Sequence, residues 1–147
     1  MSGSHPKFVT TGTATRLTIL GDAVFVRLTG ADTNGALAVF EQHANPGGGV
    51  PTHLHEREDE LFHVLAGSAR FIVAGAEIIA PVGSTVWGPR GIAHSWEVVG
   101  NSPAKLLIAV TPAGMEHMFA ELDKLPPRPP DFAKVAAICA RFGVKFG

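Results

Sequence analysis

The stretch from Gly47 to Gly67, GGGVPTHLHEREDELFHVLAG, concentrates side chains that can bind a metal ion. It holds three histidines and four carboxylates between glycines, in a chain that is 46% hydrophobic. His53 and His55 are two positions apart, and on a β-strand such residues face the same side. Two imidazoles can therefore approach one ion from a single strand.

Two further residues can complete such a site. Glu60 follows the charged turn EREDE and opens the next apolar segment, so a hairpin would return its carboxylate to the two histidines. His94 lies far along the chain, at the start of HSWEVV. Three histidines and one carboxylate form a half-open site for one divalent transition metal: Fe, Mn, Co, Ni, Cu or Zn. An open coordination position would admit water, dioxygen or a substrate oxygen, as metal catalysis requires.

Short apolar segments separated by glycine and proline predict the elements that position these side chains. The chain of 147 residues contains 17 Gly and 11 Pro. Strands that follow one another at roughly ten-residue spacing are typical of an antiparallel sandwich or barrel. The candidate strands are 14–20, 23–29, 35–44, 51–55, 60–67, 69–75, 76–83, 85–89, 93–100 and 104–111.

Helical spacing replaces these segments after Val110. We expect one helix from Pro112 to about Lys124, capped by Thr111, and a second after the N-cap Asp131, with LPPRPP as the connector between them. The apolar stripes of the two helices are Met115, Met118, Phe119 and Leu122, and Val135, Ile138, Cys139 and Phe142.

The sequence therefore predicts an all-β fold, an antiparallel β-barrel with two short C-terminal α-helices. A chain of this length suits one domain. We divide it into an N-terminal strand segment (1–24), a barrel core (25–111) and a helical appendage (112–147).

Composition disfavours several classes of partner. The net charge is −1 and no run of Lys or Arg stands out, so neither nucleic acid nor an anionic membrane is expected. The apolar runs are too short to span a bilayer, and the N-terminus lacks the apolar core of a signal peptide. Cys139 is the single cysteine. We therefore expect a cytoplasmic protein without disulfides.

The glycines around the ligands strengthen the metal interpretation. The patterns are G-x5-H-x-H-x4-E-x6-G from Gly47 and G-x5-P-x-G-x2-H from Gly83. They resemble the two signature motifs of the cupin superfamily, with nine positions at the expected spacing. One position departs, because Val98 stands where the second motif often has Asn. The resemblance covers about residues 25–111. It implies a jelly-roll barrel (a double-stranded β-helix) and a metal held by His53, His55, Glu60 and His94.

The motif has two other interpretations. Glu60 and His63 form E-x-x-H, which binds di-iron centres on helical bundles. A Gly-rich, turn-rich stretch cannot supply such a bundle, and on a strand His63 would point away from Glu60. The second alternative is a metal-free cupin, which an intact ligand set argues against. We expect Glu56, Glu58 and Asp59 to form a solvated turn.

Strand alternation from the ligands places Phe62, Val64 and Trp96 in the substrate pocket. We expect the first helix to close one end of the barrel, with Met115 and Phe119 at the substrate entrance. Such a pocket favours a small apolar or aromatic molecule. Homodimerisation is expected through an edge strand from the N-terminal segment 7–20.

The C-terminal half resembles the tails of bacterial cupins described as quercetin-dioxygenase-like. That resemblance implies a metal-dependent oxygenase in which Glu60 is the catalytic base for a substrate hydroxyl. Two alternatives stay open. One is a non-redox cyclase, isomerase or lyase that uses the metal as a Lewis acid. The other is a ligand-binding cupin without enzyme activity.

Overall fold

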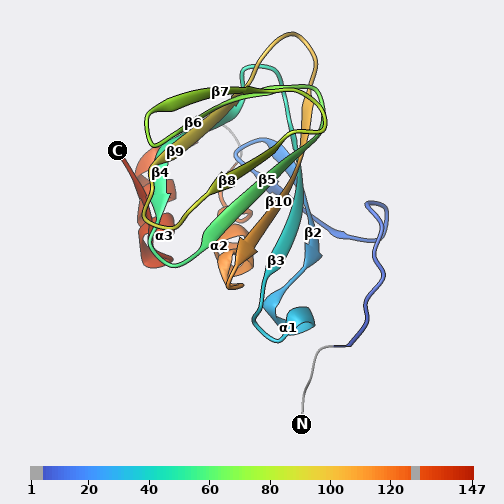
Figure 1. The fold of residues 1–147 in the computed structure, drawn as a ribbon. Helices are drawn as coiled ribbons and strands as arrows, with labels where there is room; N and C mark the ends of the chain where they lie inside the picture. The colour runs from blue at the N-terminus through green and yellow to red at the C-terminus, as the bar shows by residue number, and fades with distance from the viewer. Residues whose placement is uncertain (1–4, 127–129) are drawn as a thin grey trace.

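The structure is a computed structural model that describes residues 5–126 and 130–147, and its strands form two antiparallel sheets (Figure 1). In spatial order, the first sheet comprises β1 (Thr15–Ile19), β2 (Asp22–Leu28), β3 (Ala38–Ala44), β10 (Ala104–Thr111), β5 (Asp59–Ala66) and β8 (Thr85–Gly88). The second sheet comprises β11 (Val144–Phe146), β4 (Gly49–His55), β9 (His94–Val98), β6 (Ala69–Val73) and β7 (Ala76–Ala80). The ten strands expected from the sequence are all present, and the all-β barrel prediction is confirmed.

Alternation along the strands explains how the two sheets enclose a core. On β5, Glu60, Phe62 and Val64 are buried, whereas the intervening Leu61 and His63 are partly exposed. This period of two follows from the pleat of the strand, which sends successive side chains to opposite faces. The largest side chains that are completely buried come from both sheets: Phe40, Phe62, Phe71, Leu106, His94, Val24, Val64 and Val110.

Two C-terminal helices follow β10: α2 (Met115–Leu122), drawn in orange near the centre of Figure 1, and α3 (Phe132–Arg141), drawn in red on the left beside β4. The predicted start of the first helix at Pro112 is wrong, because β10 continues through Thr111 and α2 begins after Gly114. Thr111, the predicted cap, belongs to β10 instead. The Glu116 carboxylate accepts a hydrogen bond at 2.6 Å from the backbone N–H of Gly114, the residue before α2.

The second helix begins as predicted. The side chain of Asp131 accepts hydrogen bonds from the backbone N–H groups of Ala133 and Lys134. The expected LPPRPP connector falls partly on residues 127–129, which lie outside the described residues. No helix in the described ranges is both long enough and apolar enough to cross a membrane.

Two short elements were not predicted from the sequence. One is α1 (Gly30–Thr33), and the other is β11, which extends the second sheet beside β4. In that pairing Val144 lies opposite His55 and Phe146 opposite His53. The strand that carries two predicted metal ligands therefore has a hydrogen-bonded neighbour on each side, β9 and β11.

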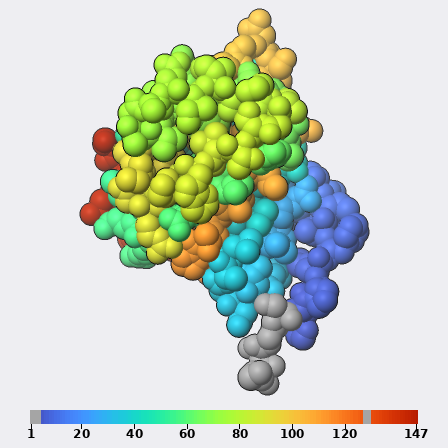
Figure 2. All heavy atoms as spheres, in the orientation of Figure 1, coloured from blue at the N-terminus to red at the C-terminus, as the bar shows by residue number. Residues whose placement is uncertain are grey.

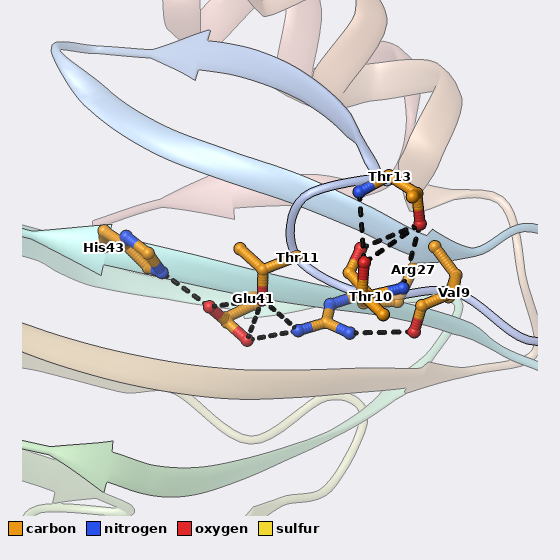
Figure 3. Close-up of polar contacts among 7 residues, drawn as sticks. All are labelled: Val9, Thr10, Thr11, Thr13, Arg27, Glu41 and His43. Carbon is orange, nitrogen blue, oxygen red and sulfur yellow. Dashed lines mark hydrogen bonds and ion pairs between the residues drawn. The ribbon is translucent and has the colours of Figure 1, made fainter.

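The N-terminal segment is tied to the outer face of the first sheet (Figure 3). Arg27 on β2 donates to the carbonyl oxygen of Val9 at 3.3 Å and to the Glu41 carboxylate at 2.6 Å. His43 lies 2.6 Å from the same carboxylate. In Figure 2 this blue segment lies away from the lime-green atoms of β6 and β7. β1 follows the N-terminal segment and lies at the edge of the first sheet. Homodimerisation through this edge stays a prediction.

Candidate metal centre

Four side chains from three strands meet inside the barrel. His53 and His55 lie on β4, Glu60 on β5 and His94 on β9, and all four are buried. Each residue offers one ligand atom, and these atoms lie within 4.8 Å of one another. Antiparallel pairing of β4 with β9 sets His53 opposite His94. The structure thus assembles the four residues that spacing and the motifs had grouped.

Backbone carbonyls orient two of the histidines. His53 Nδ1 donates to the carbonyl oxygen of Pro51 at 2.8 Å, and His94 Nδ1 donates to that of Ile92 at 3.3 Å. Because a carbonyl can only accept, these partners assign the ring proton to Nδ1 and a lone pair to Nε2. Yet His94 Nε2 lies 3.0 Å from Oε1 of Glu60, which is also an acceptor. Two acceptors this close need a proton or a metal ion between them.

His55 is oriented by a carboxylate that the sequence analysis assigned to a solvated turn. Glu58 is only 5% exposed, and its Oε1 lies 2.8 Å from His55 Nδ1. The expectation of a solvated position is therefore wrong for Glu58, although Glu56 is exposed. Residues i and i+3 come together here because the chain turns between β4 and β5. A carboxylate on the outer nitrogen of a histidine is typical of metal sites, where it fixes the tautomer and raises ligand basicity.

Burial and ionic contacts set the charges of the cluster. Burial by itself would raise the pKa of Glu60, but the contacts with His55 and His94 outweigh it and hold that pKa at about 2. Burial would lower the pKa of His55, but Glu58 and Glu60 outweigh it and raise the pKa to about 9. Burial does dominate at His53, whose pKa falls to about 4. Without an ion, a proton on His55 supplies the positive charge beside Glu60.

These features fit one divalent metal ion. His55 Nε2 is buried and lies 3.1 Å from Glu60 Oε1, but it is not aligned for a hydrogen bond with any described residue. His53 is neutral, as a ligand must be, and a metal ion would replace the proton on His55. Three imidazole nitrogens and one carboxylate oxygen suit the six metals expected from the sequence. The four residues that would hold the ion are His53, His55, Glu60 and His94.

A cavity of about 330 Å³ opens onto this cluster, and its walls are mostly apolar. Trp96, Met115 and Phe119 line it, together with His53, His55 and Glu60. The apolar side chains that complete its walls are Ile19, Leu20, Val50, Pro51, Ile108, Met118, Leu122, Pro130, Phe132, Val135, Val144 and Phe146, with Cys139 beside them. Helix α2 therefore forms one wall of the cavity. The sequence suggested such a place for its residues Met115 and Phe119.

The structure places two other expected pocket residues elsewhere. Phe62 and Val64 point inward, but neither lines the cavity. Phe62 packs against the rings of His94 and Phe71, with centroid distances of 5.7 and 5.1 Å. Strand alternation reports which face a side chain occupies, but not its height along the barrel. Both residues therefore belong to the core behind the ligands.

Two polar residues of the cavity wall, Asp22 and Gln42, were missed by the sequence analysis. Their signal was available, because both occupy inward positions on strand faces that are otherwise apolar. Two arginines that could have anchored an anion do not reach the cavity. Arg27 pairs with Glu41 on the outer face, and Arg70 pairs with Glu97.

We expect the Glu58→Gln variant to bind the metal about 10- to 100-fold more weakly, the range typical when the hydrogen-bond partner of a ligand is altered. The amide is nearly isosteric but lacks the charge that makes His55 a strong ligand. Competition with a chromogenic chelator measures the affinity. Glu56→Gln, at an exposed neighbouring carboxylate, is the matched control and should leave it unchanged. Equal affinities in the two variants would mean that Glu58 does not support the site.

Comparison with known proteins agrees with the fold. Residues 40–110 match the family model described as Cupin domain. KdgF from Halomonas sp. is 14% identical over 77% of this chain and 99% of its own, with a TM-score of 0.69.

Two other solved structures are also similar. A Thermotoga maritima protein described as a predicted oxalate decarboxylase is 25% identical over 71% of this chain and 98% of its own (TM-score 0.63). A Silicibacter pomeroyi protein described as a sugar phosphate isomerase from a cupin superfamily is 21% identical over 72% and 75% (TM-score 0.62). No curated protein matches the chain. The family match over residues 40–110, the jelly-roll fold and the converging histidines and glutamate together show that this chain contains a cupin domain.

Proposed function

We propose that this cupin is a metal-dependent enzyme for a small, largely apolar or aromatic molecule, and that it is an oxygenase of the quercetin-dioxygenase type. One observation carries the proposal: an apolar cavity opens directly onto His53, His55 and Glu60, three members of the cluster that His94 completes. Such a cavity can hold an aromatic body while an oxygen substituent reaches the metal.

The cavity wall supports the choice of substrate class. Among the described residues that line it there is no lysine or arginine, so a phosphate or a cluster of carboxylates would find no cationic side chain apart from the metal cluster itself. Trp96 and Phe119 offer aromatic faces, and Met115 and Met118 offer flexible thioethers that adapt to ligand shape. A ring system with few charges fits these surroundings.

The protein's own groups have separate roles in this proposal. When bound, the metal supplies an electrophilic centre and, if it is redox-active, chemistry with dioxygen. Glu60 lines the cavity, so its carboxylate is placed to accept the proton of a substrate hydroxyl. The apolar walls exclude water, which strengthens electrostatic interactions at the reacting centre.

Oxygen uptake tests the proposal directly. Protein loaded with Fe, Mn, Ni, Cu or Zn is supplied with quercetin or catechol in an oxygen electrode. We expect uptake with at least one redox-active metal, none with Zn, and none in the His53→Ala/His94→Ala variant. Turnover of a substrate without oxygen uptake would favour a cyclase, isomerase or lyase. Metal-dependent binding of the compounds without any turnover would favour a ligand-binding cupin.

We expect Phe119→Ala to raise the KM for an aromatic substrate about tenfold and to leave metal content unchanged. Phe119 lines the cavity and packs edge-to-face on Phe40 with a centroid distance of 4.7 Å, so its removal opens the wall but touches no ligand. Loss of such a ring also costs about 3–5 kcal/mol of folding stability. Phe119→Leu, which keeps most of the volume, separates the two effects. Phe8→Ala, at an exposed ring, is the control, and an unchanged KM in both Phe119 variants would contradict the role.

A further inference from the structure

A second polar group lies in the same cavity, on the inner face of the first sheet. Phe40, Gln42 and Ala44 are the inward positions of β3, so Gln42 is an amide on an otherwise apolar face. Asp22 begins β2, the strand that pairs with β3. Both side chains line the cavity that also reaches His53, His55 and Glu60. The cavity therefore has two polar groups joined by apolar walls.

The two side chains hold each other in place. Gln42 Nε2 donates to Asp22 Oδ2 at 3.0 Å, and the backbone N–H of Asn45 also donates to the Asp22 carboxylate. Gln42 is 7% exposed, so the amide is almost fully removed from bulk water. Burial raises the pKa of Asp22, and these two hydrogen bonds offset only part of that effect.

The Asp22–Gln42 pair has unused hydrogen-bond acceptors, and no described residue is a cationic partner for it. A carboxylate has about four lone-pair sites, and two donors reach Asp22. Within the described ranges, no residue forms an ion pair with Asp22 and none donates to the amide oxygen of Gln42. Asp22 is partly exposed, and a carboxylate beside apolar walls attracts a cation more strongly than a carboxylate in bulk water does. A ligand with a positively charged donor would supply the missing partner.

We propose that Asp22 and Gln42 bind a primary ammonium group at the end of the substrate that is remote from the metal. The ammonium donates one hydrogen bond to the Asp22 carboxylate and a second to Gln42 Oε1, while the apolar body of the substrate spans the cavity. This deepens the proposed function, since it takes the cavity as the substrate site. It narrows the substrate class to aromatic amines that also carry a metal-binding oxygen.

Matched pairs of small probes test the assignment. Dopamine and 4-ethylcatechol share a catechol head and differ in the amine. Phenethylamine and 2-phenylethanol repeat the comparison without a catechol. In calorimetric titrations of the Zn-loaded protein we expect each amine to bind at least about tenfold more tightly than its neutral partner, as for a charge-assisted hydrogen bond.

Two carboxylate variants identify the group responsible. In Asp22→Asn the preference for the amine should fall to about one, while binding of 4-ethylcatechol is unchanged. Asp32→Asn, at a carboxylate outside the cavity that pairs with Lys7, should retain the preference. A purely structural role for the Asp22–Gln42 pair would lower the melting temperature without changing the ratio of the two affinities. Equal binding of amine and neutral probe to the parent protein overturns the proposal, as does a preference that survives Asp22→Asn or no amine binding at millimolar concentration.

The metal-free His53→Ala/His94→Ala variant separates this inference from the proposed function. It should lose affinity for the catechol head but still prefer phenethylamine to 2-phenylethanol. If catechols bind equally well with and without metal, the proposed function fails while the ammonium site stands. If catechols need the metal but no probe pair shows an amine preference, only the ammonium site fails.

Discussion

Stoichiometric metal should be lost when His53 and His94 are replaced together by alanine. These residues face each other across the β4–β9 pair, so the double variant removes two of the four ligands. His55 and Glu60 alone cannot hold a transition metal against exchange with solvent, because protein sites for these ions generally use three or more protein ligands. Elemental analysis of protein from unsupplemented cells measures ions per chain, with about one expected for the parent protein.

His63→Ala is the matched control for this experiment. His63 lies on β5 three positions from Glu60, but its ring is on the opposite face and its Nδ1 lies 2.8 Å from Thr85 Oγ1. Metal content should therefore be unchanged. A double variant that keeps one ion per chain would show that the ligand set is wrong, and loss of metal from His63→Ala would show that the face assignment of β5 is wrong.

Replacement of Gly49 by alanine should have the largest effect on folding of any single methyl addition near the site. A Cβ at Gly49 would lie 2.1 Å from the carbonyl oxygen of Trp96 and 2.7 Å from the Cα of Glu97. Both are backbone atoms of β9, so no side-chain rotation relieves the overlap. We expect a loss of about 3 kcal/mol in the free energy of unfolding, at the upper end for overpacking, measured by urea denaturation of the metal-free protein.

The same substitution should weaken metal binding, because it forces β4 away from the strand that carries His94. Gly12→Ala is the control, since its Cβ would meet only Thr10 Oγ1, at 3.8 Å. It should change stability by less than about 1 kcal/mol. A Gly49→Ala protein as stable as the parent would mean that the close approach of β4 and β9 does not exist in solution.

The strands and the shared face of His53 and His55 could be predicted from the sequence because they depend on local rules, whereas Glu60 and His94 were joined to them through the resemblance to the cupin motifs. The H-x-H spacing needs only the period of two along a strand, which is why His53 and His55 share a face. Glycine and proline mark the strand ends for the same local reason. Asp131 was identified as an N-cap from its own side-chain chemistry, and the structure confirms it.

The remaining features depend on contacts between distant segments or on the exact path of a turn. In the sequence, Glu58 is not distinguished from the other charged residues of EREDE. Only the path of the turn between β4 and β5 brings its carboxylate to His55. β11 has only three residues, and its pairing with β4 spans most of the chain. Phe62 and Val64 were assigned to the correct face of β5 but to the wrong position along the barrel axis. The alternation of side chains along a strand predicts the face and not that position. Asp22 and Gln42 become a pair only when β2 lies beside β3.

The placement of β11 has a thermodynamic consequence for the site. Val135 of α3 lines the cavity, and the same segment continues through Gly143 into β11, which is hydrogen-bonded to the strand bearing His53 and His55. A ligand that displaces α3 therefore also displaces the neighbour of the metal-binding strand. Thermodynamic linkage makes such coupling reciprocal. If the bound metal changes the affinity for the ligand by some factor, the bound ligand changes the affinity for the metal by the same factor. Where that factor differs from one, occupancy of the cavity changes how tightly the ion is retained.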